Sequence, residues 1–217
     1  MIRNSTIKDF VSDYYAGKIK EHGCTPKGVD WKDEASQNLR FDVLYKLFAH
    51  DPDASVIDLG CGYGAFLQYI RSKGHRGKYI GLDICPDMLS LAKSGFASDN
   101  NALFLDKLND GDVHDYVVSS GIFNVKEAIA ETAWMDYIRD TLEWKNAHAR
   151  HGFSFNSLTS YADEDRKIPR LFYANSLELF DLCKKSYSRH VSLLHDYGLY
   201  EFTIIVRKNL PSASVYP

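Results

Sequence analysis

Three glycines stand between a short apolar run and a helical pattern near residue 60. The run SVIDLG is typical of a buried strand, and the segment GAFLQYIRSKG has the spacing of a helix that ends at Gly74. Between them lies the sequence Gly60-Cys61-Gly62-Tyr63-Gly64. Glycine permits positive φ and exposes bare backbone, so a loop of this kind at the carboxyl end of a strand can receive a nucleoside.

The next apolar run, KYIGLD, ends in Asp83, and a carboxylate there can accept protons from both ribose hydroxyls. The alternative is that the glycines only form a tight turn, but the strand–loop–helix–strand order and the acid disfavour it. A dinucleotide loop reads GxGxxG, whereas this loop reads GxGxG. Asp58, two residues before the first glycine, would meet a cationic amino group better than a pyrophosphate. We therefore expect a methionine-derived zwitterion and not NAD.

From Ser55 onwards, apolar runs alternate with helical patterns, which predicts a mostly parallel sheet with helices on both faces. The end of the chain, HVSLLHDYGLYEFTIIVRK, reads as a hairpin and predicts one antiparallel strand. Residues 1–50 contain two helical patterns, the second from about Asp33 to Ala49, and another covers residues 125–150. We expect a helical lid over residues 1–50 and a core over residues 51–217, forming one domain.

Composition and charge limit the functional classes. The chain has 217 residues and a formal net charge of −3, without a long Lys/Arg block, which argues against a nucleic-acid substrate. No stretch approaches the ~18 consecutive apolar residues of a membrane span, and the N-terminus lacks the apolar core of a signal peptide. Four scattered cysteines predict reduced thiols in a cytoplasmic protein, and no cluster of His, Asp and Glu has metal-site spacing.

The segments VIDLGCGYG and YIGLD resemble the first two motifs of the class I S-adenosylmethionine-dependent methyltransferases. The whole chain is similar to small bacterial members that act on small molecules, through its GVDW segment, VSSGIFN and the ending LLHDY…LYEFTIIVRK. The resemblance implies a Rossmann-like α/β fold with the strand order 3-2-1-4-5-7-6 and an antiparallel strand 7. It also implies S-adenosylmethionine as the cofactor, which leaves as S-adenosylhomocysteine.

The resemblance further implies how the cofactor is held. Asp58 and the loop Gly60–Gly64, with Gly60, Cys61, Gly62 and Gly64, would hold the methionine end, and Asp83 would hold the ribose. Ile84 would flank the adenine, and Asp106 best matches the acid that pairs with the adenine amino group. Ser120 and Gly121 match the end of the fourth strand, which faces the sulfonium.

Aromatic residues of the N-terminal lid are further candidates for cofactor binding. Tyr14 and Trp31 flank an interrupted helix and could close over the cofactor and pack π faces against the sulfonium. Arg40 could reach a carboxylate of the cofactor or of the acceptor. The alternative for Tyr14 and Trp31 is ordinary packing of a terminal helix.

The acceptor pocket should form at the carboxyl ends of the fourth and fifth strands, under the lid. This placement nominates Asn124, Tyr173 and His195 as catalytic candidates. The pair His195-Asp196 could act as a general base, although HDYG also suits a turn. Asn124 suits equally a helix N-cap for the pattern over residues 125–150.

Together these features predict a metal-independent methyltransferase that transfers a methyl group to an N or O atom of a small polar metabolite by in-line displacement. The expected partners are a small-molecule acceptor and, at most, a second copy of the chain. An RNA or protein methyltransferase is one alternative, but SGIFN stands where many base-methylating enzymes carry NPPY or DPPY. The other alternative is a non-catalytic protein that binds S-adenosylmethionine.

Overall fold

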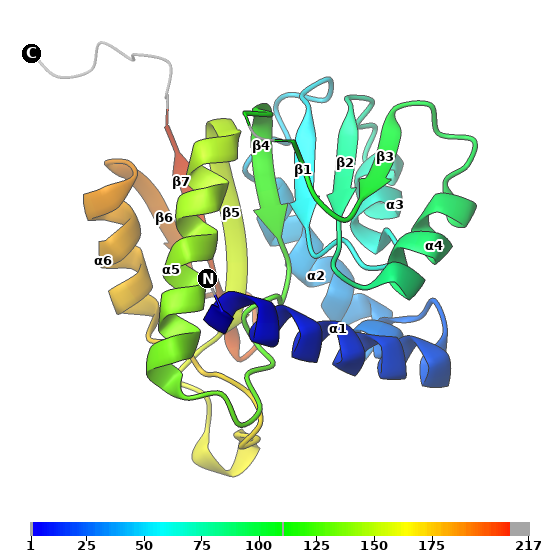
Figure 1. Cartoon of the computed structure of the whole chain (residues 1–217). Coiled ribbons are helices and arrows are strands. Elements are labelled where there is room, and N and C mark those ends of the chain that lie inside the picture. The colour runs from blue at the N-terminus through cyan, green and yellow to red at the C-terminus, as the bar shows by residue number, and fades with distance from the viewer. Residues whose placement is uncertain (1, 110, 209–217) are drawn as a thin grey trace, which may run out of the picture.

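A seven-stranded sheet forms the centre of the computed structural model, which describes residues 2–109 and 111–208. The strand order is β3-β2-β1-β4-β5-β7-β6, and β7 is antiparallel to both of its neighbours, whereas the other paired strands are parallel (Figure 1). Both features confirm the prediction. The strands are β1 (Val56–Leu59), β2 (Tyr79–Leu82), β3 (Ala102–Leu105), β4 (His114–Ser119), β5 (Ala149–Leu158), β6 (His190–Leu194) and β7 (Glu201–Arg207).

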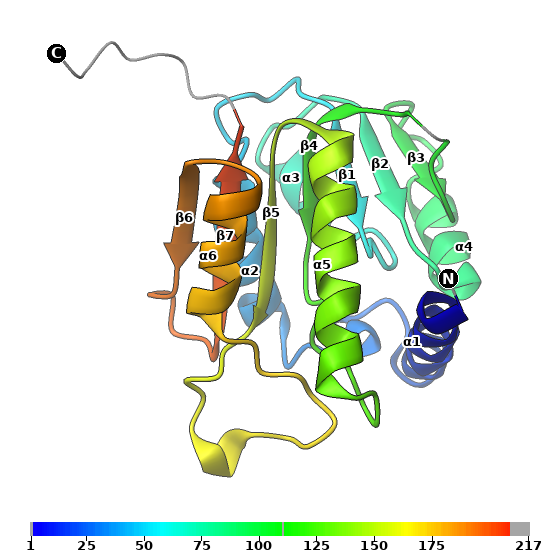
Figure 2. The same ribbon diagram turned by 60° about the vertical axis from the view of Figure 1, so that its left-hand side comes forward.

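Helices lie on both sides of this sheet. In Figure 1, α5 and α6 lie in front of it, α2 and α3 lie behind it, and α4 lies beside the β3 edge, and Figure 2 shows the arrangement from another side. Helix α1 crosses below the carboxyl ends of β1, β2 and β3 (Figure 1). The helices are α1 (Ile2–His22), α2 (Glu34–Tyr45), α3 (Ala65–Ser72), α4 (Pro86–Gly95), α5 (Glu131–His148) and α6 (Ser176–Ser186), with short 3-10 helices η1 (Pro26–Val29) and η2 (Glu164–Arg166).

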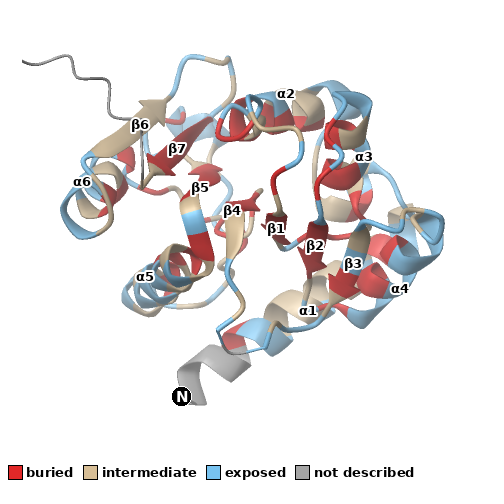
Figure 3. Cartoon of the chain, turned by 90° about the horizontal axis from the view of Figure 1, so that it is seen from above, coloured by how far each residue is buried: buried red, intermediate tan, exposed pale blue. Residues whose placement is uncertain are grey.

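The sheet divides the core into two layers. Behind it, Phe41 and Phe66 pack with the back-facing side chain of Tyr79, and in front of it Trp134 packs with Ile57. Residues of β1, β2 and β7 are buried almost throughout, as the red strands at the centre of Figure 3 show. Burial on both faces explains why these strands read as continuous apolar runs.

The long helical pattern over residues 125–150 becomes a helix only from Glu131. Val125 instead pairs with Leu171 in an isolated bridge, and Glu127 adopts a positive φ of 47°. Ala130 occupies the N-cap position of α5, so the predicted capping role of Asn124 is wrong. The predicted helix from Asp33 begins as expected, because the Asp33 carboxylate caps α2 by accepting the Ser36 N–H at 2.8 Å.

The connection from β3 to β4 is short. The described residues between Leu105 and His114 contain no helix, and this segment crosses in front of the sheet (Figure 1). Leu103 of β3 is therefore 43% exposed. None of the helices among residues 2–109 and 111–208 combines the length and apolarity needed to cross a membrane.

Candidate functional site

The glycine loop joins β1 to α3 through three left-handed backbone conformations. Gly60, Gly62 and Gly64 have φ values of 79°, 55° and 90°. A Cβ atom on Gly60 would lie 2.4 Å from Ile122, and one on Gly64 would lie 2.6 Å from the Phe96 ring. Both the positive φ and the close packing therefore require glycine, and the loop presents bare backbone at the carboxyl end of β1.

Asp83 fastens this loop to the end of β2. Its Oδ2 accepts the N–H of Gly62 and its Oδ1 accepts the N–H of Cys85, both at 2.8 Å. Burial raises the pKa of Asp83, and these two N–H donors act in the opposite direction. Each carboxylate oxygen has a second lone pair, so a half-buried Asp83 can still accept from two ligand hydroxyls.

A cavity of about 380 Å³ lies at this edge of the sheet, between the strand ends and α1. Nine of the residues predicted to bind the cofactor line it, and they come from the N-terminal segment, the glycine loop and the ends of four strands. They are Trp31, Asp58, Gly60, Cys61, Gly62, Asp83, Ile84, Asp106 and Ser120. The other predicted residues are not part of its lining: Tyr14, Arg40, Gly64, Gly121, Asn124, Tyr173 and His195.

Asp58 reaches the cavity from the end of β1 and is 3% exposed. Burial raises its pKa to about 7, although the Tyr79 hydroxyl donates to its Oδ2 at 2.6 Å and the charge of Lys145 favours the ionised form. The carboxylate therefore stands where a small change in its surroundings alters its protonation near neutral pH.

Lys145 is a site-supporting residue that the sequence analysis missed. Its fully buried Nζ donates to Ser119 Oγ at 2.6 Å and to the Ser154 carbonyl at 2.8 Å, and so ties α5 to β4 and β5. Burial lowers the pKa of Lys145 well below its usual value, and the charge of Asp58 opposes that shift. Lys145 follows Trp134, Ile138 and Leu142 at helical spacing, so it lies on the apolar face of α5. This spacing was the sequence signal that could have predicted a buried lysine.

Helix α1 closes one side of the cavity. Lys8, Val11, Ser12 and Tyr15 line it, and Ser12 Oγ donates to the Ile84 carbonyl at 3.3 Å. Tyr15 therefore lines the cavity, whereas its neighbour Tyr14 does not. The two tyrosines meet edge to face with ring centroids 5.1 Å apart, so adjacent positions on α1 have different surroundings.

Tyr14 belongs instead to a polar cluster that fastens the lid. Its hydroxyl donates to Asp30 Oδ2 at 2.7 Å and accepts from Arg170 Nη1 at 2.6 Å. Lys18 also contacts Asp30, at 2.9 Å. Arg170 comes from the connection between β5 and α6, so this cluster joins α1 and η1 to a segment far away in the sequence.

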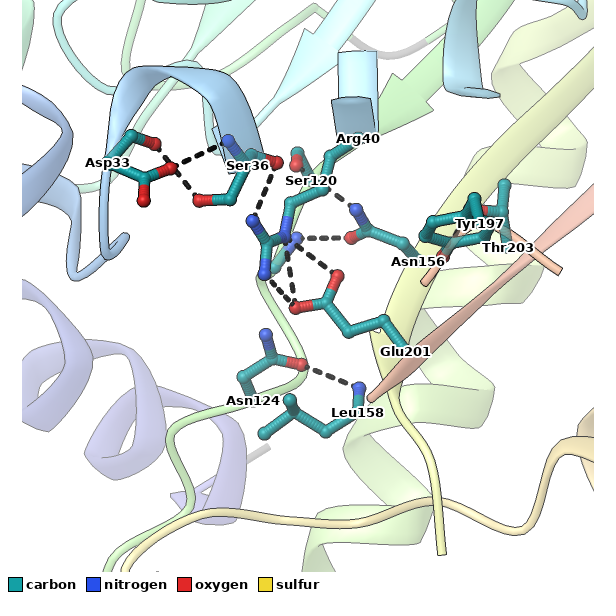
Figure 4. A network of polar contacts seen from close by, with 11 residues as sticks. Asp33, Ser36, Arg40, Ser120, Asn124, Asn156, Leu158, Tyr197, Glu201 and Thr203 are labelled. Carbon is teal, nitrogen blue, oxygen red and sulfur yellow. Dashed lines mark hydrogen bonds and ion pairs between the residues drawn. The ribbon is translucent and has the colours of Figure 1, made fainter. Parts of the chain in front are cut away.

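A second polar network lies beside Ser120 (Figure 4). Arg40 of α2 pairs with Glu201 at the start of β7, and its guanidinium carbon lies 4.0 Å from the centroid of the Trp31 ring. Asn156 of β5 accepts the N–H of Gly121 at 2.6 Å and donates to Ser120 Oγ at 3.3 Å. Lid, β4, β5 and β7 therefore meet at one place beside the cavity.

The three predicted catalytic side chains have partners outside the cavity. Asn124 Oδ1 accepts the Leu158 N–H at 3.2 Å (Figure 4), and the Tyr173 hydroxyl accepts the Ile168 N–H at 2.9 Å. His195 is exposed, and its ring lies near those of Tyr161 and Phe202. A direct catalytic role for each of them stays a prediction.

The residues of the cavity fit the cofactor that the resemblance implies. Asp83 offers free lone pairs for ribose hydroxyls, and apolar Ile84, Met88 and Leu108 suit a flat base. Asp58 suits an ammonium group beside bare loop backbone. Among the residues described, no three His, Cys, Asp or Glu side chains group as metal ligands would.

Comparisons with known proteins agree with this geometry. Residues 50–149 match the family model of a methyltransferase domain. Rv1506c of Mycobacterium tuberculosis, a protein described as a methyltransferase, is 49% identical over 160 residues, which cover 74% of this chain and 96% of that protein.

Solved structures share the fold at low sequence identity. The N-methyltransferase NodS of Bradyrhizobium japonicum, in complex with S-adenosylhomocysteine, has a TM-score of 0.64 at 10% identity and covers 91% of this chain and 97% of its own. Magnesium protoporphyrin IX methyltransferase of Synechocystis, also with bound S-adenosylhomocysteine, has a TM-score of 0.62 at 13% identity, with coverage of 94% and 99%.

Proposed function

The chain belongs to the class I S-adenosylmethionine-dependent methyltransferases, and we propose that it methylates a nitrogen or oxygen atom of a small polar metabolite. The observation that carries this proposal is the position of α1. It crosses the carboxyl ends of the strands and contributes Lys8, Val11, Ser12 and Tyr15 to the cavity wall (Figure 1). A cavity covered in this way supports a small acceptor over a folded macromolecule.

The cofactor, S-adenosylmethionine, supplies an electrophilic methyl group on a sulfonium when bound. We assign Asp83 to its ribose hydroxyls and Ile84 and Asp106 to its adenine. Asp58 would hold its ammonium group against the glycine loop. Ser120, which lines the cavity at the end of β4, would face the reacting atoms.

Methyl transfer is an in-line displacement, so positioning of the acceptor carries much of the rate enhancement. The N-terminal segment and the β4 end contribute the polar side chains of Lys8, Ser12, Tyr15, Gln37 and Ser120 to the cavity wall. Of these we assign Tyr15, Gln37 and Ser120 to the acceptor. An amine acceptor has to arrive unprotonated, and its lone pair needs no metal. NodS, which shares the fold, is named an N-methyltransferase, and this supports nitrogen as one of the two acceptor atoms.

Asn124, Tyr173 and His195 do not line the cavity and contact other segments of the chain. We propose that they act on the acceptor only when the lid and these segments adjust around it. Residues 1–50 would then move as the lid and residues 51–217 would serve as the core.

The experiment is a methyl-transfer screen. The protein is incubated with S-adenosylmethionine carrying an isotopic methyl label and with separate panels of small amines, small hydroxyl compounds, total RNA and protein extract. We expect labelled product and S-adenosylhomocysteine only with a small-molecule panel, at equal rates with and without EDTA. Label in RNA or protein would contradict the proposal, and loss of activity in EDTA would contradict its metal independence. Asp83→Ala serves as the cofactor-deficient control.

A further inference from the structure

Arg40 and Glu201 form a buried ion pair between α2 and β7 (Figure 4). Arg40 Nε lies 2.8 Å from Glu201 Oε2, and Nη2 lies 2.6 Å from Oε1. Arg40 Nη1 donates in addition to the Ser36 carbonyl at 2.7 Å. The residues are 8% and 1% exposed. Each of the three Arg40 nitrogens thus has an acceptor within the chain itself, which leaves Arg40 poorly placed to hold a carboxylate of the cofactor or acceptor.

A pair of this kind costs free energy to bury. Removing two charges from water is expensive, and well-packed apolar replacements of such pairs are often neutral or stabilising. Stability alone therefore gives a weak reason for placing Arg40 and Glu201 here. The geometry of the neighbouring Trp31 gives a stronger one.

Trp31 is held between the two sides of this network. The Arg40 guanidinium carbon lies 4.0 Å from the centroid of its ring, within the range of a cation–π contact. Its Cζ2 and Cη2 atoms lie so close to Gly121 that a Cβ there would approach both to 2.5 Å. Gly121, with φ of 73°, is itself fixed by Asn156, which is 1% exposed.

The wall of the cavity depends on this arrangement. Trp31 and Ser120 both line the cavity. Trp31 stacks on Arg40, which Glu201 of β7 holds, and Ser120 accepts a hydrogen bond from Asn156 of β5. A displaced Trp31 would change the width of the cavity beside the end of β4. This is the end where the methionine part of the cofactor and the acceptor would meet.

We propose that Arg40 and Glu201 are positioning residues that hold Trp31 against the end of β4 and thereby set the width of the methyl-transfer compartment. The inference rests on the proposed function for its effect on the acceptor. Its effect on Trp31 and on the cofactor is independent of any acceptor.

The test compares Arg40→Met, Glu201→Met and the double variant R40M/E201M with the wild type. The indole N–H signal of Trp31 is assigned in a ¹⁵N NMR spectrum from its loss in Trp31→Phe, and affinities for S-adenosylhomocysteine and adenosine are measured by calorimetry. Arg76→Met is the matched control, because Arg76, like Arg40, binds a carboxylate through two nitrogens. Its partner is Asp53, and this pair is exposed and does not line the cavity.

We expect the double variant to melt closer to the wild type than either single variant, since no unpaired charge is left buried. Its Trp31 signal should shift while the Trp134 signal stays in place. Affinity for S-adenosylhomocysteine should fall about three- to tenfold, as for the loss of a contact of roughly 1 kcal/mol, and affinity for adenosine should not change.

An unchanged Trp31 signal in the folded double variant would overturn the inference. So would equal losses of affinity for S-adenosylhomocysteine and adenosine, because these would indicate general damage. A Trp31 shift as expected, together with a negative metabolite screen, would leave the positioning role intact and count against the proposed function alone. With an acceptor in hand, the double variant should raise KM for it more than it lowers kcat.

Discussion

The Asp83 carboxylate lines the cavity and also fixes the glycine loop. It already accepts the N–H groups of Gly62 and Cys85, and its remaining lone pairs are the ones that we assign to the ribose hydroxyls. We predict that Asp83→Ala weakens S-adenosylhomocysteine binding about 10- to 100-fold, as hydrogen bonds to a charged group are worth roughly 1.5–3 kcal/mol. Titration calorimetry measures this change.

Two ligands that differ at the ribose distinguish a lost ribose contact in Asp83→Ala from a distorted glycine loop. An S-adenosylhomocysteine analogue without the 2′-hydroxyl should bind the wild type more weakly than the natural ligand does. In Asp83→Ala the two ligands should bind alike, because the acceptor of that hydroxyl is gone. If the variant still discriminates between them as the wild type does, Asp83 does not bind the ribose.

We predict that cofactor binding depends on pH through the Asp58 carboxylate. Burial raises its pKa to about 7, and an ammonium partner needs the ionised form, so binding below that pH must release a proton. Affinity for S-adenosylhomocysteine should therefore rise up to tenfold per unit from pH 5 to 7 and level off above pH 7. Asp58→Asn should abolish the slope.

A second variant checks the physical cause of this pH dependence. The Tyr79 hydroxyl donates to Asp58 and favours its ionised form. Tyr79→Phe should therefore raise the pKa of Asp58 and move the plateau of affinity to higher pH. A profile that is flat in the wild type between pH 5 and 7 would exclude Asp58 as the ammonium partner.

The cofactor half of the site was open to prediction because its residues are contiguous in the sequence. Asp58, the glycines, Asp83 and Ile84 follow two adjacent strands, and strand ends meet at one edge of a parallel sheet. Glu201 and Asn156 could not be assigned in this way. Arg40 meets Glu201 across 161 positions, and Gly121 meets Asn156 across 35, so their pairing depends on the finished sheet.

At the level of elements, α1 covers the cavity and is the helix that we propose acts as a lid. It bonds to the core through Ser12 and the Ile84 carbonyl, and through the cluster of Tyr14, Asp30 and Arg170. Arg170 is also the place where the connection between β5 and α6 meets the segment after β4, because its carbonyl accepts the Lys126 and Glu127 N–H groups. Three segments around the cavity are thus joined at one residue.

We predict that Arg170→Met loosens this lid. The ion pair between Arg170 and Asp30 is partly exposed, so its loss should lower the free energy of unfolding by at most about 1 kcal/mol. Release of S-adenosylhomocysteine should accelerate about two- to fivefold. Stopped-flow displacement measures that rate. Arg139→Met, which removes an exposed pair with Glu178, is the control and should release the ligand at the wild-type rate. Equal release rates in both variants would show that the contacts of Arg170 with Tyr14 and Asp30 do not limit ligand release.

Periodicity predicted most elements but not their boundaries. The strands follow apolar runs that are buried on both faces, and each run was recognisable alone. The helical pattern predicted a helix from residue 125, but α5 begins only at Glu131. Val125 instead pairs with Leu171, which is distant in the sequence. Tyr14 and Tyr15 show the same limit on α1, since adjacent residues of a helix face different partners and only packing decides which one lines the cavity.

At the scale of the whole molecule, the cofactor should act as a stabilising ligand. The cavity is built from the lid, the glycine loop, α5 and several strand ends, so it exists only in the folded chain. A ligand that binds only the folded state at 100 times its Kd adds about 2.7 kcal/mol to the free energy of unfolding. For a chain of this size each kcal/mol raises Tm by about 2–4 °C.

We therefore predict that saturating S-adenosylhomocysteine raises Tm by about 5–10 °C. NADH at the same concentration should leave Tm unchanged, because the GxGxG loop suits a pyrophosphate poorly. Thermal scans of wild type and Asp83→Ala give the comparison, and the variant should need a higher ligand concentration for the same shift. Stabilisation by NADH and none by S-adenosylhomocysteine would contradict the cofactor assignment, since the folded cavity would then select a dinucleotide.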